Sequence, residues 1–477
     1  MKNSRREFIK HAGITGIGLA ASNIALAHTA IAGNDSLVQG YSGRFNMNGY
    51  AAPKIETVRI GFIGVGSRGL GALMRLSKIE GVNIVAICDL DASRTDIGLK
   101  ALKSSGFKPV VYAGKEDAWK QVCERTDVDL VYTCTPWHLH TPIAVFAMEH
   151  EKHAAVEVPA AMTIEDCWKL VKVSEKTRRH CMMLENCCYD FFELLTLNMA
   201  RQGIFGDIIH CEGAYIHSRT HKVLSEKPNW RVRENMGRNG NLYPTHGLGP
   251  GCQIMNINRG DRLDYMTSMS GNDFTLQKEI TKLAETKEEW KEFANKKFRG
   301  NMNVSTIRTV NGRTIMLQHD VSSPRIYSRI HLVSGTKGSA LKYPLPGKIQ
   351  LDGEEWISDS EMQKIEQQYT PEIIKRMGET AKIVGGHGGM DLLMDWRLID
   401  CLRNGLPLDM NVYDAVTYSC IEPLSEWSVS HRSKPIDIPD FTSGAWKTNK
   451  DVLDINLKNG GGNTKVQAIA SENQLKI

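Results

Sequence analysis

The stretch Val58-Arg59-Ile60-Gly61-Phe62-Ile63-Gly64-Val65-Gly66-Ser67-Arg68-Gly69 decides the fold of this chain. Its first six residues predict a short buried strand, its last six have the spacing GxGxxG, and Leu70 to Ile79 predicts a helix. In such a turn the first glycine permits the tight bend, the second lets a pyrophosphate approach the backbone, and the third lets the helix pack on the strand. The helix N-terminus adds unpaired N–H groups for the anion. The stretch therefore predicts a dinucleotide-binding unit.

An acidic residue completes this motif. A second predicted strand, Ile84 to Cys88, ends in Asp89, which lies 20 positions after Gly69. A carboxylate there accepts hydrogen bonds from the adenosine ribose hydroxyls and repels a 2′-phosphate, so NAD is favoured over NADP. Arg68 and Arg94 are the nearby cations that would favour the phosphate instead.

Strand-like and helix-like segments continue to alternate along the chain up to Val156. This alternation predicts an α/β fold with a doubly wound parallel sheet. From Ile204 onward the strand-like segments are longer, which predicts a second α/β domain with an open, largely antiparallel sheet that has one polar face. These longer segments are Asp207 to Tyr215, Thr306 to His319 and Tyr327 to Ser334.

The N-terminus has the pattern of a twin-arginine (Tat) signal peptide. Arg5 and Arg6 precede a weakly apolar run from Ala12 to Ala27, and small residues offer two cleavage sites, Ala25-Leu26-Ala27 and Ala30-Ile31-Ala32. We therefore expect export by the Tat pathway to the periplasm; the alternative is a cytoplasmic amphipathic N-terminus. No later stretch approaches the roughly 20 apolar residues of a membrane span.

Composition bounds the function. At 477 residues and 41% hydrophobic the chain predicts more than one globular domain. Its 59 basic and 54 acidic residues are spread along the sequence, which argues against a nucleic-acid partner and favours a small polar ligand. The expected domains are residues 1–32 (signal peptide), 33–56 (leader or linker), 57–185 (NAD-binding domain), 186–450 (substrate domain with C-terminal helices) and 451–477 (a loose tail after Gly460-Gly461-Gly462).

The 11 cysteines show no zinc spacing, so we expect buried, reduced thiols and no metal. Two other segments follow predicted strands and so fall at the ligand-binding edge of a parallel sheet. These are Thr135 to His140 and Glu157-Val158-Pro159. For His138 and His140 two interpretations stay open: contact with the cofactor, or capping of the next helix.

The order of these motifs resembles the family that groups glucose-fructose oxidoreductase with inositol dehydrogenase. Its dehydrogenases usually carry Glu-Lys-Pro where this chain has Glu157-Val158-Pro159, and valine cannot serve as the proton relay that the lysine provides. Together with Arg5-Arg6 and Glu157-Val158-Pro159, three further segments resemble glycoside hydrolase family 109: Trp137 to His140, Asn241 to Pro250, and Gly385 to Asp391. That resemblance implies a bacterial α-N-acetylgalactosaminidase that keeps NAD bound through its cycle.

The second domain supplies the expected sugar site. His246 has an imidazole able to take and return protons at neutral pH, which makes it the expected general base, with Tyr243 as its partner. Trp230 could stack on a pyranose ring and Arg231 could bind hydroxyls or an acetamido oxygen, the alternative being surface packing. Tyr327 resembles another tyrosine of the family's site, the alternative being core packing.

The resulting expectations fall into three sets. The catalytic residues are His246, Tyr243 and Tyr327. The cofactor-binding residues are Gly64, Gly66, Ser67, Arg68, Gly69, Asp89, Trp137, His138, His140, Glu157, Val158, Asn186 and His387, the last in a glycine-rich segment that would otherwise be a flexible loop before a helix from Met390 to Arg403. The substrate-binding residues are Tyr215, Trp230, Arg231, Tyr243, Thr245, His246 and Tyr327.

The resemblance also implies a redox-neutral mechanism: oxidation at C3 of the sugar, removal of the acidified C2 proton, elimination at C1, addition of water and re-reduction. It needs no pair of catalytic carboxylates, and none stands out in this sequence. Two alternatives stay open, a periplasmic NAD-linked sugar oxidoreductase and a non-catalytic sugar-binding protein that retains NAD. The open sheet face leaves surface for a homodimer.

Overall fold

The structure, a computed structural model, describes residues 45–467, so the predicted signal peptide lies outside the described residues. The first sheet has the order β3-β2-β1-β4-β5-β6, and every neighbouring pair is parallel. The doubly wound sheet is therefore confirmed. Its strands are β1 (Val58–Ile63), β2 (Val82–Asp89), β3 (Val110–Ala113), β4 (Leu130–Thr133), β5 (His153–Val156) and β6 (Cys181–Met183).

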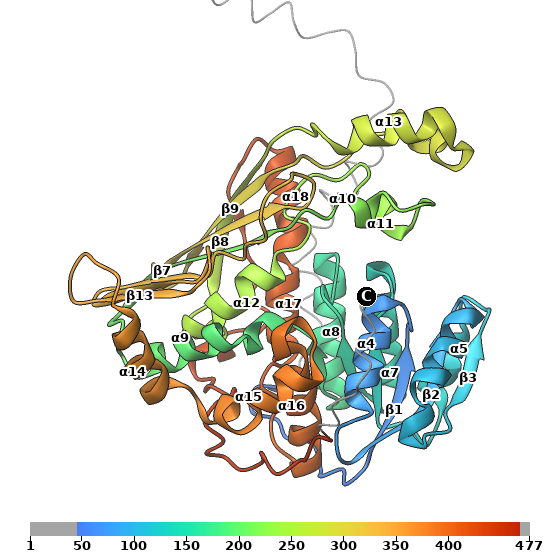
Figure 1. Ribbon diagram of the computed structural model, residues 1–477, viewed down its shortest axis with the longest axis horizontal. Helices are drawn as coiled ribbons and strands as arrows, with labels where there is room; N and C mark the ends of the chain where they lie inside the picture. Colours follow the sequence, from blue (N-terminus) through green and yellow to red (C-terminus); the bar gives the residue numbers. More distant parts are fainter. Residues whose placement is uncertain (1–44, 468–477) are drawn as a thin grey trace, which may run out of the picture. The chain divides into compact units, whose positions relative to one another are not determined.

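Helices cover both faces of this sheet (Figure 1). Apolar residues of the central strands are fully buried, including Val58, Ile60 and Phe62 of β1, because a parallel sheet is enclosed on both sides. The helices are α4 (Ser67–Leu76), α5 (Ala92–Ala101), α6 (Ala118–Glu124), α7 (His140–Glu149) and α8 (Ile164–Thr177).

The second sheet is mixed and has the order β13-β12-β11-β7-β10-β9-β8-β14. All its neighbouring pairs are antiparallel except β7 with β10, which confirms the expected open, largely antiparallel sheet. The strands are β7 (Ile208–Ile216), β8 (Leu263–Ser270), β9 (Asn303–Thr309), β10 (Thr314–Asp320), β11 (Leu332–Gly335), β12 (Gly338–Leu341), β13 (Lys348–Leu351) and β14 (Ile436–Asp437).

Two strand predictions for this sheet were wrong in their extent. The segment predicted as one strand over Thr306 to His319 is a hairpin, because Gly312 adopts φ +86° between β9 and β10. The segment predicted to begin at Tyr327 enters the sheet as a strand only at Leu332, so Tyr327 lies in the connection that precedes β11.

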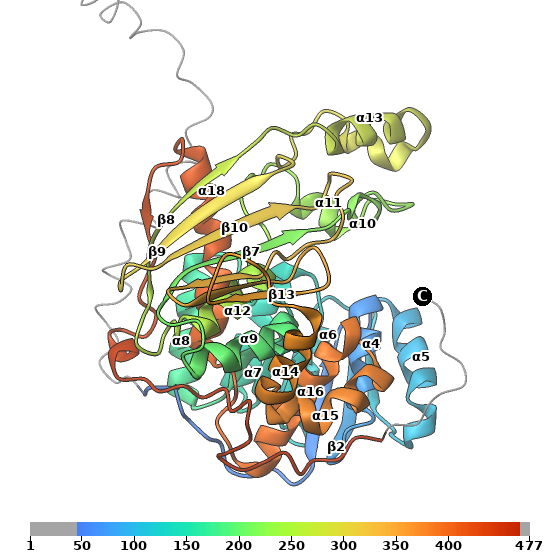
Figure 2. The same ribbon diagram turned by 60° about the vertical axis from the view of Figure 1, so that its left-hand side comes forward.

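One face of the open sheet is covered by helices α12 (Thr245–Ile254) and α18 (Ile421–Ser430), as Figure 2 shows. At one point the backbones of α12 and β7 lie directly against each other, with no side chain between them. A Cβ atom built on Gly213 would lie 2.0 Å from the carbonyl oxygen of Gly247. The glycines after His246 therefore permit close packing of a helix on the sheet, and His246 lies in the first turn of α12.

The remaining helices differ in how far they are buried, and the helix from Met390 is buried along almost its whole length. The predicted helix from Met390 is confirmed as α16 and ends at Asn404, with Gly405 in the left-handed conformation. It returns to the nucleotide-binding sheet, where Asp395 accepts hydrogen bonds from Arg75 (2.8 Å) and Tyr132 (2.7 Å). With α16 (Met390–Asn404), the helices of this part are α9 (Phe191–Arg201), α10 (Thr220–Val223), α11 (Trp230–Glu234), α13 (Leu276–Thr286), α14 (Asp359–Tyr369), α15 (Glu372–Val384) and α17 (Val412–Ser419).

The expected loose tail after residue 450 is wrong for the part that the structure describes. The buried carboxylate of Asp400 accepts the backbone N–H of Gly462 (2.7 Å) and of Thr464 (3.3 Å). The indole of Trp396 donates to the carbonyl of Thr464 (2.8 Å), and Val466 forms a β-bridge with Ile79. Side chains of α16 thus hold in place a segment whose glycine-rich composition predicted a loose terminus.

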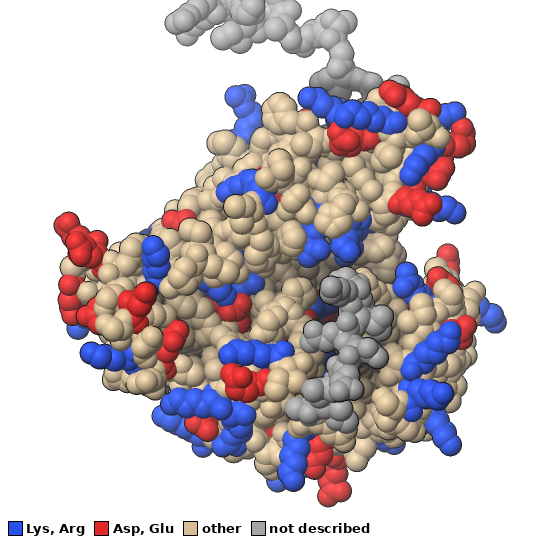
Figure 3. Space-filling model, in the orientation of Figure 1, with Lys and Arg blue, Asp and Glu red and all other residues tan. Residues whose placement is uncertain are grey.

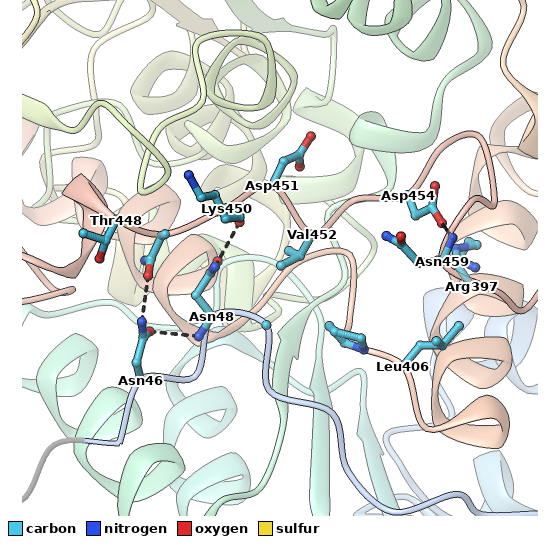
Figure 4. Close-up of a pocket in the computed structure, with 13 residues that line it drawn as sticks. Asn46, Asn48, Arg397, Leu406, Thr448, Lys450, Asp451, Val452, Asp454 and Asn459 are labelled. Carbon is cyan, nitrogen blue, oxygen red and sulfur yellow. Dashed lines mark hydrogen bonds between the residues drawn. The ribbon is translucent and has the colours of Figure 1, made fainter.

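A cavity of about 350 Å³ lies between residues 46–49 and residues 448–459 (Figure 4). Its polar groups bond to one another: Asn46 donates to the side chain of Asn449 (2.7 Å), and Asn48 donates to the carbonyl of Lys450 (2.9 Å). The cavity contains none of the predicted site residues, and these bonds fasten the start of the described chain to its C-terminal part.

Two predictions on composition can be compared with the structure. All 11 cysteines are free, and all are buried except Cys134, which is partly buried, as expected for reduced thiols. Within residues 45–467 no helix is long and apolar enough to cross a membrane. On the face shown in Figure 3, basic and acidic side chains are interspersed.

Candidate active site

The glycine-rich turn has the geometry that a dinucleotide needs. Gly64 adopts φ +90°, and a Cβ atom there would lie 2.7 Å from the carbonyl of Cys134. A Cβ atom on Gly69 would lie 1.9 Å from the carbonyl oxygen of Gly64, whereas one on Gly66 would meet open space. No side chain caps the N-terminus of α4. The turn therefore presents its amides to an incoming phosphate, as NAD requires.

Asp89 lies at the end of β2, beside this turn. Its carboxylate accepts the backbone N–H of Val65 (2.7 Å) and of Asp91 (3.0 Å). These bonds fix the orientation of the carboxylate and leave each oxygen a further acceptor position. The residues present thus fit the adenosine ribose of NAD.

Arg68 and Ser67 both lie in the first turn of α4, but Arg68 points to carboxylates. Its Nε lies 2.5 Å from Glu157 Oε1, and its Nη1 lies 2.7 Å from Asp391 Oδ2. Burial lowers the pKa of Arg68, but the two carboxylates raise it by more, so the guanidinium stays charged. Arg68 therefore joins three segments that are far apart in the sequence.

Asp391, at the start of α16, contacts two further predicted cofactor residues, His387 and Asn186. Its Oδ2 also lies 2.8 Å from His387 Nδ1, and its Oδ1 accepts the amide of Asn186 (2.5 Å). Burial raises the pKa of Asp391, but the bond from His387 and the charges of Arg68 and Arg75 hold it well below its usual value. Asp391 is thus an ionised, buried carboxylate next to the glycine-rich turn.

The two histidines after β4 have different surroundings. His140 is buried, and its ring nitrogens lie 2.7 Å from the Pro159 carbonyl and 2.8 Å from the Thr135 carbonyl. Both nitrogens are thus occupied by backbone carbonyls, and no side chain caps the N-terminus of α7, so the capping interpretation does not hold for His140. His138 is exposed, with Nδ1 3.9 Å from Glu234 Oε1. Val158 is buried and brings no charge to the position of the family lysine.

Aromatic side chains link the nucleotide-binding unit to the open sheet. The ring of Trp137, which follows β4, lies 5.3 Å from Trp230 and 5.8 Å from Tyr243 (centroid distances). Tyr243 in turn lies 4.8 Å from Tyr215 on β7 and 4.9 Å from His246. The structure thus brings together five residues that were predicted on four separate segments, and we call them the aromatic cluster.

Two further predicted substrate residues border the aromatic cluster. The guanidinium of Arg231 stacks 4.1 Å above the ring of Trp230, and burial lowers its pKa. Thr245 is buried at the first position of α12, and its side chain helps to lower the pKa of Glu185. Arg231 thus places a guanidinium at the edge of the aromatic cluster, whereas Thr245 lies beside Glu185.

Tyr327 lies next to the aromatic cluster, close to the rings of His217 and Tyr215. Its centroid lies 4.9 Å from His217 and 6.5 Å from Tyr215. Its hydroxyl accepts a hydrogen bond from Arg329 (2.9 Å), which is itself held by Asp190 and Glu193. Burial raises the pKa of Tyr327 above its usual value, so the phenol is protonated at neutral pH.

His246 is held by a carboxylate that the sequence did not indicate. Its Nδ1 lies 2.7 Å from Oε1 of Glu185, which is fully buried. Burial raises the pKa of Glu185, but the neighbouring His246 and the hydrogen bonds to the carboxylate lower it by more. The pair is therefore an ionised carboxylate facing an imidazole.

These same residues also satisfy the distance criterion for a metal site. The ligand atoms of Glu185, Cys187 and His246 lie within 4.8 Å of one another. Two ligands bound to one zinc ion at about 2.0 Å in tetrahedral geometry would lie ~3.3 Å apart. The 2.7 Å between Nδ1 and Oε1 is instead the length of a charge-assisted hydrogen bond.

The sequence reasoning missed four residues of this site. Glu185 and Arg329 are buried charges whose roles depend on partners far away in the sequence, and no local signal indicates them. Asp391 ends the segment that resembles family 109, but its partners Arg68 and Asn186 are far away in the sequence. His217 could have been found, because it follows Tyr215 by two positions and a strand places such residues on the same face.

Comparison with known proteins agrees with both halves of this architecture. Residues 58–185 match the NAD-binding Rossmann fold of the oxidoreductase family, and residues 189–448 match the C-terminal domain of glycosyl hydrolase 109. The chain belongs to glycosyl hydrolase family 109. A family 109 protein from Bacteroides thetaiotaomicron is 47% identical over 410 residues, covering 83% of this chain and 86% of the relative. The resemblance predicted from sequence is confirmed.

Another family 109 relative is named for its activity. The alpha-N-acetylgalactosaminidase of Bacteroides fragilis is 48% identical over 409 residues, covering 84% of this chain and 95% of the relative. Among solved structures, levoglucosan dehydrogenase in complex with NADH and L-sorbose superposes with a TM-score of 0.63 at 16% identity, over 81% of this chain and all of that one. This last likeness shows the fold alone.

Proposed function

We propose that this family 109 glycosidase hydrolyses α-N-acetylgalactosaminides by a redox-neutral, NAD-dependent route. The observation that carries the proposal is the aromatic cluster, in which Tyr243 contacts both His246 and Trp137, in a chain without the lysine of related dehydrogenases. The name and the 48% identity of the Bacteroides fragilis relative support the choice of sugar.

The cofactor would be held by the amides of the glycine-rich turn and by Asp89, and it would supply oxidation and re-reduction at C3 of the sugar. Side chains of the protein then carry out the proton transfers. His246 removes the proton at C2 through Nε2, because Nδ1 faces Glu185. Burial raises the pKa of Tyr243 well above its usual value, so its protonated phenol is available to donate to the departing glycosidic oxygen.

The aromatic cluster and the neighbouring Arg231 also provide the groups for substrate recognition. The Trp230 ring offers a flat apolar surface for a pyranose, and the Arg231 guanidinium stacked on it can bind an acetamido oxygen. Val158 gives no proton relay, so release of a keto-sugar with net NADH is disfavoured. We also propose Tat export to the periplasm, because a recycled cofactor can be loaded once before export.

The test is turnover of the purified mature protein on p-nitrophenyl α-N-acetylgalactosaminide without added NAD, with a panel of other nitrophenyl sugars beside it. We expect many turnovers of nitrophenol release per bound NAD and no lasting rise in absorbance at 340 nm. Steady NADH formation with added NAD would identify a sugar oxidoreductase instead, and sugar binding without turnover would identify a binding protein.

A further inference from the structure

The segment after β6 places a buried carboxylate against the catalytic imidazole. Glu185 precedes the short helical turn Asn186–Tyr189, and its side chain is fully buried. Its Oε1 accepts the backbone N–H of Cys187 (3.1 Å) in addition to facing Nδ1 of His246 (2.7 Å). This backbone hydrogen bond fixes the position of the carboxylate independently of its contact with His246.

We infer that Glu185 is a positioning residue that orients His246 and sets its proton-bearing nitrogen. This inference rests on the proposed function, in which His246 is the base at C2. An ionised carboxylate can only accept hydrogen bonds, so Nδ1 carries the hydrogen and Nε2 carries the lone pair. Nε2 is thereby the nitrogen that receives the C2 proton, and the imidazolium that results is stabilised by the carboxylate.

The packing of α12 is adapted to this contact. A Cβ atom on Gly249 would lie 3.0 Å from Cγ of Glu185 and 2.9 Å from the sulfur of Cys188. Gly249 is three residues after His246, so it lies on the same side of the helix. The absence of a side chain there lets α12 approach Glu185 closely enough for the imidazole to reach it.

The other titratable groups that face His246 are phenols and a thiol. Tyr215 approaches from β7, with a centroid distance of 5.2 Å, and Tyr243 approaches from the segment before α12 at 4.9 Å. Cys187 lies on the Glu185 side, and burial raises the pKa of its thiol well above the usual value. Glu185 is therefore the group that brings a negative charge next to the imidazole of His246.

The decisive variant is Glu185→Gln, which keeps the shape and removes the charge. We expect kcat on the nitrophenyl glycoside to fall by about 10²–10³-fold with KM changed less than about threefold, as for loss of a group that assists general-base catalysis. The acidic limb of the kcat profile should move to lower pH, because the charge interaction between the Glu185 carboxylate and His246 is lost. Bound NAD should be unchanged.

Glu422→Gln is the matched control. Glu422 is also fully buried, and burial raises its pKa to about 8, so the neutral amide is a mild replacement there. Its partner is Arg238, and we expect unchanged kcat and an unchanged acidic limb.

A double-mutant cycle separates positioning from a general structural role. In a His246→Ala background, Glu185→Gln should cause no further loss of activity, since Glu185 acts through the imidazole. Additive losses, or a single variant that keeps kcat within about threefold and the same acidic limb, would overturn the inference. If Glu185→Gln does not fold, Glu185→Asp is measured in both backgrounds with the same criteria. Failure of the wild-type protein to release nitrophenol from any sugar would instead overturn the proposed function.

Discussion

Arg68 Nη1 in the glycine-rich turn lies 2.7 Å from Asp391 Oδ2 at the start of α16. The same arginine contacts Glu157 after β5, and Asp391 also binds Asn186 and His387. Residues from four separate segments thus share one buried charge network beside the phosphate-binding turn. This network ties α16 to the cofactor site, which suits the proposed retention of the cofactor between turnovers.

We predict that Asp391→Asn weakens both NAD retention and the fold. The substitution leaves the cations Arg68 and Arg75 without their shared carboxylate, and breaking a buried pair costs about 3–5 kcal/mol. Thermal unfolding and the NAD content after gel filtration measure the two effects. Arg59→Gln, which removes a partly exposed pair with Asp129, is the control and should change neither by much. Full NAD content in Asp391→Asn would contradict the retention role.

Asp89→Ala tests the placement of the adenosine ribose. The variant removes the carboxylate that accepts the Val65 and Asp91 amides and that would bind the ribose hydroxyls. We expect the purified protein to contain clearly less NAD than the wild type, with partial recovery of activity on adding NAD. Unchanged cofactor content would show that the ribose lies elsewhere.

The contact between α12 and β7 predicts a strong effect of a single methyl group. In Gly213→Ala the new Cβ would lie 2.0 Å from the carbonyl oxygen of Gly247, so α12 must move and take His246 with it. We expect a loss of about 1–3 kcal/mol in unfolding free energy together with reduced kcat. Gly271→Ala, where the nearest atom is 3.8 Å away, should behave like the wild type in the same denaturant titration.

The buried ion pairs of Glu193 with Arg329 and Lys342 predict that the protein loses stability in acid. Burial raises its pKa, but Arg329 and Lys342 lower it by more, from 4.5 to about 2. A depressed carboxyl pKa contributes stability that is complete above the unfolded value and is lost as pH falls from about 4.5 to about 2. The shift corresponds to on the order of 3 kcal/mol.

In Glu193→Gln the unfolding free energy should therefore be lower at neutral pH and should fall less steeply over that acid window. Urea titrations at several pH values measure both slopes. Glu379→Gln at an exposed pair with Lys382 is the control, with the slope of the wild type. Parallel slopes for Glu193→Gln and the wild type would refute the assignment.

The sequence predicted the parts of this protein that are encoded locally. The GxGxxG turn and the strand end at Asp89 were both recognisable because spacing alone determines them. The hairpin at Asn311-Gly312 also had a local signal, the Asn-Gly pair typical of tight turns, but it was overlooked.

Other features had no local signal. Glu185 and Asp391 acquire their roles only when distant segments fold together, and a carboxylate in the sequence does not reveal its partner. The glycines at 460–462 indicated a free tail, yet the buried Asp400 holds that segment through backbone amides. His246 was predicted by type and position, but its orientation depends on tertiary contacts.

The central claim is that glycoside cleavage passes through loss of the C2 proton to His246. The most direct measurement is hydrolysis of p-nitrophenyl α-N-acetylgalactosaminide by the wild-type protein in deuterated water, with His246→Ala beside it, followed by mass spectrometry and NMR of the released sugar. We predict deuterium at C2 in the wild-type product, and a loss of about 10²–10⁴-fold in rate for His246→Ala with NAD still bound. A product that retains its C2 proton, or full activity of His246→Ala, would contradict the account.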